Sequence, residues 1–183
     1  SAGGFVAVPV VWAAWWQKIP VHIHQSDVRL GLANKLSAPC AQSISVAWQE
    51  LRSQFSPQKT VWVGSPVRAS VVGRDRAAAL IRFGLDATLP VVVVLGGGTG
   101  ASQLNQVVAA AAPDITLHAQ MLHLTGMGKT VASPALARYH QRQFVLDEMG
   151  DVFAVANFAI TRAGMGTLSE LAANGIPSLI VPM

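Results

Sequence analysis

The sequence predicts an α/β protein in which parallel sheets are covered by helices on both faces. Short β-rich runs alternate along the chain with segments that suit helices, the order expected of parallel strands joined by crossover helices. The run Val91–Leu95 is apolar at every position, as expected of a strand buried on both faces of its sheet. Glycine-rich turns also follow expected strands and lead into expected helices. These three observations together predict the fold class.

The expected elements are short and follow one another closely. The strands are Val21–His24, Ser43–Val46, Val61–Val63, Val91–Leu95, Ile115–His118, Phe158–Thr161 and Ser178–Val181. The helices are Val8–Trp16, Gly31–Leu36, Arg74–Phe83, Ala101–Ala112, Ser133–Arg142, Met149–Ala156 and Thr167–Asn174. A domain boundary is expected at the turn Gly64–Arg68, where one strand ends and a new run begins.

The composition excludes a disordered chain and disfavours nucleic-acid binding. The 183 residues are 51% hydrophobic and 12% charged, which predicts a substantial buried core. The net charge of +4 is spread along the chain, with no run of five like charges. Nucleic acid is therefore only a weak prediction, and phosphate-bearing ligands or an anionic membrane surface fit this charge balance as well.

The single cysteine and the chain ends give further expectations. Cys40 alone cannot form an internal disulfide framework, so it suits a reducing compartment and the role of a small apolar residue. The longest apolar segment, 5–16, contains a proline and is too short to span a bilayer. The chain begins without a methionine or a basic leader and stops directly after an apolar strand. We therefore expect it to be an internal part of a longer protein.

The strongest candidate site is the stretch 160–171, which reads as a strand end, a glycine turn and a helix start. Open α/β sheets bind ligands at such places, because a helix N-terminus offers unpaired N–H groups. The residues that carry this chemistry are Gly164, Gly166, Thr167, Ser169 and Glu170. The glycines allow close approach of a ligand, the hydroxyls can cap or donate, and the carboxylate suits the two hydroxyl donors of a ribose diol. The alternative is an ordinary helix N-terminus, which uses the same residue types.

A second glycine-rich turn follows Val91–Leu95 and could cradle a pyrophosphate with its backbone N–H groups. Gly96, Gly98 and Ala101 satisfy the G-x-G-x-x-A form of the dinucleotide fingerprint. That fingerprint also requires an acidic residue at the end of the next strand, and the expected strand end at 117–120 has none. NAD binding is therefore disfavoured, and no cofactor is expected.

Other phosphate and metal motifs are incomplete. The segment 125–130 imitates the end of a P-loop, but His123 stands where that motif requires a glycine. The five histidines have no zinc-site spacing, and no D-x-D pair is present to hold a divalent ion, so no metal is expected. Backbone amides, a helix dipole and an arginine would then hold phosphates. Arg68, at the expected boundary, is the candidate, and the alternative is a solvated surface arginine.

Three tryptophans, Trp12, Trp15 and Trp16, lie close to Lys18 in an expected helix. Indole rings beside a lysine suit a membrane interface. The alternative is that the three rings are core aromatics. Complete burial is difficult for three neighbouring indoles, because each N–H needs a hydrogen-bond partner.

Six segments occur in the order and approximate spacing of a known family. They are Gly3–Pro9, His24–Lys35, Gly64–Arg68, Gly96–Ala101 with Leu104 and Asn105, Thr125–Gly128, and Arg162–Glu170 with Gly175–Pro177. Over essentially its whole length the chain therefore resembles the MurG family (glycosyltransferase family 28). These are bacterial N-acetylglucosaminyltransferases that make lipid II for peptidoglycan.

The resemblance implies a GT-B fold, with two Rossmann-like, doubly wound domains facing a cleft. Residues 1–67 would be the C-terminal part of the domain that binds the acceptor lipid I. Residues 68–183 would be the first part of the domain that binds UDP-N-acetylglucosamine (UDP-GlcNAc). The implied reaction is an inverting, metal-independent transfer of N-acetylglucosamine to the 4-hydroxyl of the N-acetylmuramoyl unit. The enzyme would lie peripherally on the cytoplasmic face of the bacterial plasma membrane.

The resemblance also implies roles for single residues. Donor-binding residues would be Arg68, Gly98, Leu146, Met165, Gly166, Thr167, Leu168, Ser169 and Glu170. Among these, Glu170 would bind the ribose hydroxyls, and Leu146 would lie beside the uracil. Met165, Gly166 and Leu168 would belong to the same loop as this donor-binding motif.

Outside the donor-binding part, the resemblance implies substrate contacts for Asp27, near the sugar, and for Asn34. It places Trp15, with Trp12 and Trp16, on a patch that faces the membrane.

The sequence departs from the family pattern at several site positions. Asp27 replaces an asparagine, so a carboxylate that only accepts stands where an amide could also donate. Gly98 replaces a serine, and Gln25 and Ser26 replace a glutamate and a glutamine. Asp27 is a candidate general base. The family's first glycine-rich loop, with its histidine, would precede Ser1, so the base could also lie outside this chain, which alone is expected to be inactive.

Two other functions stay open. A different GT-B glycosyltransferase, acting on another lipid acceptor such as a diacylglycerol or polyisoprenoid, would share Glu170 and the glycine-rich turns. A non-catalytic nucleotide-sugar-binding subunit would fit the missing hydroxyl at Gly98 and the altered segment 25–27.

Overall fold

The structure, a computed structural model, describes residues 1–97, 101–132, 136–145 and 147–182. It divides into two compact units, Ser1–Pro66 and Val67–Met183, so the chain passes between them within the turn 64–68. Which substrate each unit binds stays a prediction.

The first unit is a parallel sheet with strand order β1-β2-β3 and helices packed on one face. Its elements are α1 (Ala7–Trp16), β1 (His22–Gln25), α2 (Leu32–Ser37), η1 (Ala38–Cys40), β2 (Ser43–Val46), η2 (Gln49–Gln54), η3 (Pro57–Lys59) and β3 (Thr60–Trp62). The core forms where Val11 of α1 meets Ile23 and Ile44 of the sheet. Cys40 is buried in the same core, where it packs as a small apolar side chain.

The described part of the second unit is a parallel sheet with strand order β6-β5-β4-β7-β8. Its elements are η4 (Ala69–Val71), α3 (Arg76–Phe83), β4 (Val91–Leu95), α4 (Ser102–Ile115), β5 (Gln120–Leu124), β6 (Tyr139–Arg142), α5 (Met149–Val155), β7 (Phe158–Arg162), α6 (Met165–Ala173) and β8 (Ser178–Val181). The apolar strand β4 lies at the centre. Leu95 pairs with Leu124 of β5 and Thr161 of β7, so three strand ends lie side by side.

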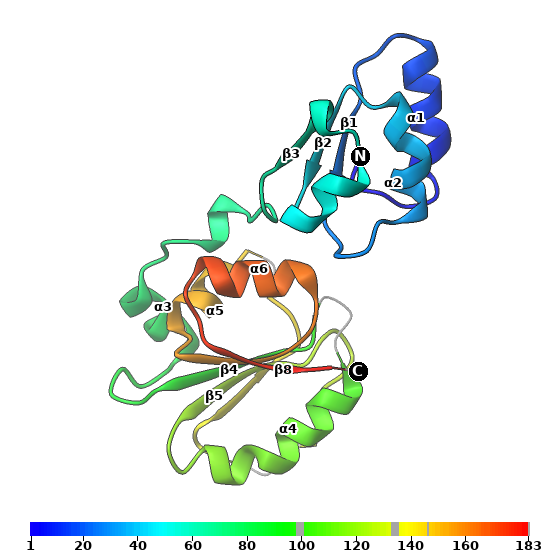
Figure 1. The fold of residues 1–183 in the computed structure, drawn as a ribbon. Helices are drawn as coiled ribbons and strands as arrows, with labels where there is room; N and C mark the ends of the chain where they lie inside the picture. The colour runs from blue at the N-terminus through cyan, green and yellow to red at the C-terminus, as the bar shows by residue number, and fades with distance from the viewer. Residues whose placement is uncertain (98–100, 133–135, 146, 183) are drawn as a thin grey trace. The chain divides into compact units, whose positions relative to one another are not determined.

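Helices cover both faces of this second sheet (Figure 1). On one face Val93 of β4 joins a cluster with Phe83 of α3 and Phe153 of α5. On the other face Val94 joins a cluster with Leu104 of α4. Successive residues of β4 thus point to opposite faces and both are buried, as the uninterrupted apolar run predicts. The expected α/β class with parallel sheets is confirmed.

Local sequence sets the ends of α3. The Asp75 carboxylate accepts hydrogen bonds from the N–H groups of Ala77 at 2.8 Å and Ala78 at 3.4 Å, so it caps the N-terminus. Gly84 ends the helix in the left-handed conformation, at φ 67°.

The expected strand Ile115–His118 is wrong. Helix α4 continues through Pro113 to Ile115, and the Thr116 hydroxyl closes its last turn by donating to the carbonyl of Ala112 at 2.8 Å. The next strand, β5, begins only at Gln120. Proline costs the helix a single hydrogen bond here, near its end, so the helix tolerates it.

The expected helix Ser133–Arg142 is also wrong where the structure describes it. Tyr139–Arg142 forms the strand β6, which pairs with β5 in parallel register. Residues 133–135 lie outside the described residues. The polar sequence of β6 has no strand pattern, so pairing with β5, a tertiary contact, decides its conformation. The other expected helices and strands form, with ends that differ slightly.

Helix α1 exposes its tryptophans, so the interpretation of these rings as core aromatics is wrong. Trp12 is 50% exposed, Trp15 57% and Trp16 84%, and only Val11 of α1 is buried. The indole of Trp12 donates to the carbonyl of Leu36 at 3.3 Å, which fastens α1 to α2. In the described parts of the chain, every helix is too short or too polar to cross a bilayer.

Candidate donor-binding site

The topology of the second unit makes a binding crevice at the carboxyl end of β4. From β4 the chain passes through α4 to β5 on one side, whereas β7 pairs on the other side. Such a switch point leaves a crevice between the loops that follow the two neighbouring strands. Two adjoining pockets open there.

The apolar pocket is formed by the loops after β4, β5 and β6 together with α5 and α6. It is lined by Leu95, Gly96, Gly97, Leu124, Gly126, Gln143, Phe144, Val145, Met149, Phe153, Thr167 and Glu170. The glycine pocket is formed by the loops after β4 and β7 and is lined by Gly96, Gly97, Thr161, Arg162, Ala163, Gly164 and Thr167. The two pockets share Gly96, Gly97 and Thr167, so a single ligand with an apolar and an anionic part could occupy both.

Thr161 fixes the two strand ends that carry the pockets. Its side chain is buried, and its hydroxyl donates to the carbonyl of Leu95 at 3.0 Å. The loop that begins at Gly96 is therefore tied to the end of β7. Gly97 has φ +82°, a conformation that side chains with a Cβ rarely adopt.

The expected strand, glycine turn and helix at 160–171 are present, but the helix begins earlier than expected. Met165, Gly166 and Leu168 lie in α6 rather than in a loop. Gly164 is the N-cap residue and Thr167 makes no capping hydrogen bond to it. The hydroxyl of Ser169 donates to the carbonyl of Met165 at 2.9 Å, one turn back in the same helix. Thr167, which lines both pockets, is thus better placed than Ser169 to donate to a ligand.

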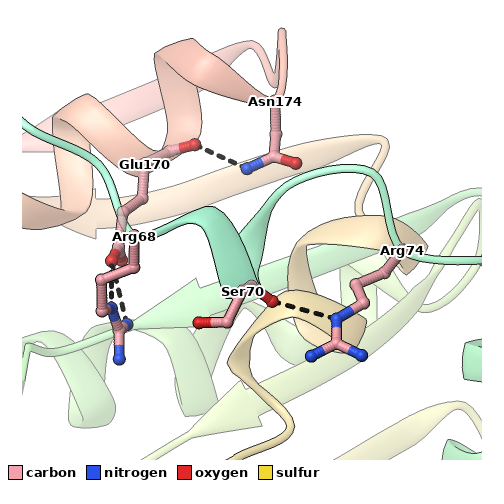
Figure 2. A network of polar contacts seen from close by, with 5 residues as sticks. All are labelled: Arg68, Ser70, Arg74, Glu170 and Asn174. Atoms are coloured by element: carbon pink, nitrogen blue, oxygen red, sulfur yellow. Dashed lines mark hydrogen bonds and ion pairs between the residues drawn. The ribbon is translucent and has the colours of Figure 1, made fainter.

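Arg68 and Glu170 form an ion pair at the apolar pocket (Figure 2). Nε and Nη2 of Arg68 each lie 2.9 Å from Oε1 of Glu170. The Glu170 side chain is 15% exposed, whereas that of Arg68 is 59% exposed. Among the described residues, no hydrogen bond reaches Oε2 of Glu170. The structure thus joins two residues that the sequence singled out separately.

The backbone that carries Arg68 is anchored to the core of the second unit. The carbonyl of Arg68 accepts from the N–H of Val71, a core residue of η4. Nε of Arg74 donates to the carbonyl of Ser70 at 2.9 Å, which closes the turn (Figure 2). A Cβ at Gly150 of α5 would lie 2.7 Å from this carbonyl, so α5 packs directly against the turn.

The candidate residues of the first unit lie around the end of β1. Asp27 is exposed on a bend, and Nε2 of Gln25 donates to the carbonyls of Asp27 at 3.0 Å and Arg29 at 2.9 Å. Asn34 is buried, and its Nδ2 donates to Oε1 of Gln25 at 2.7 Å. Asn34 therefore supports the bend through Gln25, while Asp27 is the residue of this group that meets solvent.

Several pocket residues are missing from the sequence-based set. Phe144, Val145, Met149 and Phe153 form the apolar wall, and Gln143 contributes its polar side chain. The position of Gln143, Phe144 and Val145 depends on β6, which directly precedes them and which the sequence does not reveal. Two expected donor-binding residues, Gly98 and Leu146, lie outside the described residues. In the described part of the chain, no group of three His, Cys, Asp or Glu residues could hold a metal ion.

Family models match both units. The model of the glycosyltransferase family 28 C-terminal domain matches residues 91–183, and that of the family 28 N-terminal domain matches residues 1–46.

Two curated relatives of the chain are named as N-acetylglucosamine transferases. The chain is 36% identical over 184 residues to "UDP-N-acetylglucosamine--N-acetylmuramyl-(pentapeptide) pyrophosphoryl-undecaprenol N-acetylglucosamine transferase 2" of Bacillus anthracis, covering 100% of this chain and 52% of the relative. It is 36% identical over 185 residues to the transferase of that name, without the number, from Legionella pneumophila strain Lens, covering 100% of this chain and 51% of the relative. The chain thus spans about half the length of the curated relatives it matches.

Solved structures share the fold. MurG of Acinetobacter baumannii superposes with a TM-score of 0.67 at 23% identity, covering 100% of this chain and 51% of that chain. The UDP-GlcNAc 2-epimerase of Neisseria meningitidis, solved with UDP-GlcNAc, has a TM-score of 0.73 at 13% identity, covering 98% of this chain and 57% of that chain. These likenesses support the GT-B type of α/β fold.

Proposed function

Because this chain belongs to glycosyltransferase family 28, we propose that it binds UDP-GlcNAc and transfers N-acetylglucosamine to lipid I. The acceptor would be the 4-hydroxyl of the N-acetylmuramoyl unit on undecaprenyl pyrophosphate, and the products lipid II and UDP. The names of the relatives support this choice of donor and acceptor.

The observation that carries the proposal is that Glu170 is held by Arg68 at the apolar pocket. Arg68 occupies one carboxylate oxygen, Oε1, and the side chain lines the apolar pocket. A ribose diol presents two hydroxyl donors, and a carboxylate that is held in place accepts them without first having to be ordered. We therefore assign the ribose to Glu170, the uracil to the apolar wall and the diphosphate to the glycine pocket.

The glycine pocket suits a diphosphate. The first N–H groups of α6 have no acceptor within the helix, and the helix dipole places positive partial charge at that end. Gly96 and Gly97 also line this pocket. Together with Arg68, which contacts the pocket residue Glu170, these groups would compensate the charge that develops on the leaving diphosphate, usually the largest contribution to such catalysis.

The proposed reaction is a single displacement. The acceptor oxygen bonds to the anomeric carbon of N-acetylglucosamine as the bond from that carbon to the diphosphate breaks, which inverts the configuration. The hydroxyl proton passes to a general base. Asp27 is a candidate for that base, because its carboxylate is exposed on a bend that Gln25 holds in shape.

We also propose that the exposed apolar face of α1 contacts the cytoplasmic surface of the membrane that carries the lipid acceptor. The exposed apolar side chains are Val10, Trp12, Trp15 and Trp16 of α1 and Phe5, Val6 and Ile19, which flank it; together they are called the apolar face of α1. Exposed aromatic and aliphatic side chains on a helix favour the interface between water and lipid.

The first test is donor binding by a Glu170→Gln variant. Loss of the charged acceptor should weaken binding of UDP-GlcNAc at least about tenfold, because a hydrogen bond to a charged group contributes about 1.5–3 kcal/mol. Glu148→Gln is the matched control, since Glu148 also pairs with an arginine, Arg82, but lines neither pocket. Titration calorimetry measures both affinities. Equal affinities for the two variants would contradict the donor-site assignment.

The second test follows labelled N-acetylglucosamine from UDP-GlcNAc onto a lipid I analogue, with a diacylglycerol as competing acceptor. Transfer to lipid I alone supports the proposed reaction. Transfer to the diacylglycerol identifies a different GT-B enzyme. Donor binding without any transfer would overturn the catalytic part of the proposal and favour a nucleotide-sugar-binding subunit.

Arg68→Met tests the phosphate role of Arg68. We expect its affinity for UDP to fall severalfold more than its affinity for uridine, because only UDP carries the charge that the guanidinium would meet. The melting temperature should stay nearly unchanged, since an exposed ion pair contributes at most about 1 kcal/mol. An equal fall for UDP and uridine would instead mean that Arg68 acts only by holding Glu170.

A further inference from the structure

Three polar side chains, two of them fully buried, form a hydrogen-bonded network that links β6, β5 and α4 to the segment 125–129. His123 of β5 is fully buried, with Nδ1 2.6 Å from the hydroxyl of Tyr139 and Nε2 3.1 Å from Oδ1 of Asn105. Asn105 of α4 is also fully buried, and its Nδ2 donates to the carbonyls of Thr125 at 2.8 Å and Lys129 at 3.1 Å. The chain of bonds therefore ends on the backbone of the segment that follows β5.

The chemistry of these groups fixes the direction of each bond. Nδ2 of Asn105 donates to two carbonyls, so its Oδ1 must accept from His123. His123 therefore carries its proton on Nε2, and its Nδ1 accepts from the hydroxyl of Tyr139. Removal of any one side chain leaves another buried group without its partner.

The protonation states agree with this arrangement. Burial lowers the pKa of His123 to about 4 and raises the pKa of Tyr139 to about 12. Both side chains are therefore neutral near neutral pH, as the directions of the hydrogen bonds require.

The segment 125–129 connects this hydrogen-bonded network to the apolar pocket. Gly126 lines the pocket, and its N–H donates to the carbonyl of Gln143 at 2.8 Å. The N–H of Gly128 is also held in place, because it donates to Oε1 of Gln143 at 3.1 Å. Asn105 holds one side of the segment and Gln143 the other, so the conformation of the pocket wall depends on both.

We propose that His123, Asn105 and Tyr139 are positioning residues that hold the segment 125–129 in the conformation needed for donor binding, although none of them lines either pocket. This inference rests on the proposed function, because it takes the apolar pocket as part of the donor site. The proposed role of the three residues can be stated without the donor. His123 sets the orientation of the Asn105 amide, and that amide in turn holds the carbonyls of Thr125 and Lys129.

The test compares His123→Leu with a control on the same strand. Gln120 begins β5, is also buried, and is bonded to a loop at the amino end of the sheet, where its Oε1 accepts from the N–H of Asp86 at 2.9 Å. Both His123→Leu and Gln120→Leu delete buried polar bonds from β5. Only His123→Leu should weaken UDP-GlcNAc binding, with a dissociation constant about tenfold higher by calorimetry. Only His123→Leu should also speed amide hydrogen exchange at residues 126–129.

His123→Gln and Tyr139→Phe are the milder variants. Glutamine can still donate to Oδ1 of Asn105, so we expect His123→Gln to restore most of the donor affinity and the slow exchange of 126–129. Tyr139→Phe removes a single hydroxyl and keeps the ring, so it reports on the network even if His123→Leu fails to fold. We expect an intermediate loss of affinity for it. The ring nitrogen NMR shifts of wild-type His123 should identify the form protonated on Nε2.

The outcomes separate this inference from the proposed function. If the wild-type chain binds UDP-GlcNAc and both Leu variants lower stability with unchanged affinity and unchanged exchange at 126–129, the positioning role is overturned. The same holds if ring nitrogen shifts show the proton on Nδ1. If the wild-type chain does not bind UDP-GlcNAc, the proposed function fails, while the exchange comparison still tests whether the network holds the segment.

Discussion

At the scale of single residues, burial makes the stability of the second unit depend on pH. The pKa of His123 falls from 6.5 to about 4 because its ring is removed from water. Below pH about 6.5 the unfolded chain binds a proton that the folded chain does not, so acid favours unfolding.

We therefore expect the free energy of unfolding to decrease as the pH falls from about 6.5 to about 4, by about 3 kcal/mol in total, at 1.36 kcal/mol per pKa unit. Urea unfolding at several pH values measures this slope. The pKa of His140, in the same unit, is also lowered, mainly by burial, and adds a slope of the same sign. His123→Gln isolates the contribution of His123, and a variant with the wild-type slope would contradict the prediction.

At the scale of elements, a single hydroxyl joins the two strand ends that frame the crevice. Thr161 of β7 bonds to the last carbonyl of β4, at Leu95, and both carry loops that line the pockets. The substitution Thr161→Val keeps the shape of the side chain and removes the bond.

Thr161→Val should lower the free energy of unfolding by about 1 kcal/mol and also weaken UDP binding, because the two loops would lose their common anchor. Thr116→Val is the matched control: its buried hydroxyl donates to Ala112 at the end of α4 and lines neither pocket. It should lower stability by a similar amount and leave UDP binding unchanged. Denaturant titration measures the stability of both variants, and calorimetry measures their affinity for UDP. If Thr161→Val and Thr116→Val lost affinity equally, the crevice assignment would be contradicted.

The elements also show where sequence is a sufficient guide. β4, with an uninterrupted apolar run, and α3, with a capping Asp75 and a terminal Gly84, follow from local signals. β5 is harder to recognise, because His123 interrupts its apolar pattern although the side chain is buried through hydrogen bonds. β6 has no local signal at all, since its strand conformation arises from pairing with β5.

The contrast between local signals and tertiary contacts also explains which parts of the candidate site could be predicted from the sequence. The strand end and glycine turn before α6 could be located from sequence, and the structure places Glu170 at the pocket that results. The apolar wall of Phe144 and Val145 could not, because it follows β6. The contact of Arg68 with Glu170 joins residues 102 positions apart, and no pattern within a short window encodes such a pair.

At the scale of the whole molecule, the chain carries an exposed apolar face on one unit and the pockets on the other. The substitutions Trp15→Ala and Trp16→Ala together should reduce binding to phospholipid vesicles severalfold, because each indole removes a large apolar area from water. Ile81→Ala is the control, since Ile81 is 82% exposed but lies on α3, in the other unit.

Vesicle co-sedimentation measures the binding, and the melting temperature of each variant shows that the fold is retained. Wild-type binding by the tryptophan variant, or an equal loss with Ile81→Ala, would show that the face of α1 does not contact lipid.

The pairing of Arg68 with Glu170 has a consequence for which anions the site accepts. Since the two opposite charges cancel, the wall presents no net attraction to a small free anion such as phosphate, which would have to compete with the carboxylate for the guanidinium. A nucleotide diphosphate can meet that competition, because its base and ribose gain contacts that phosphate lacks. If the pocket binds a nucleotide sugar as proposed, the ion pair would thus favour that ligand over abundant inorganic anions, which gain little from a paired guanidinium.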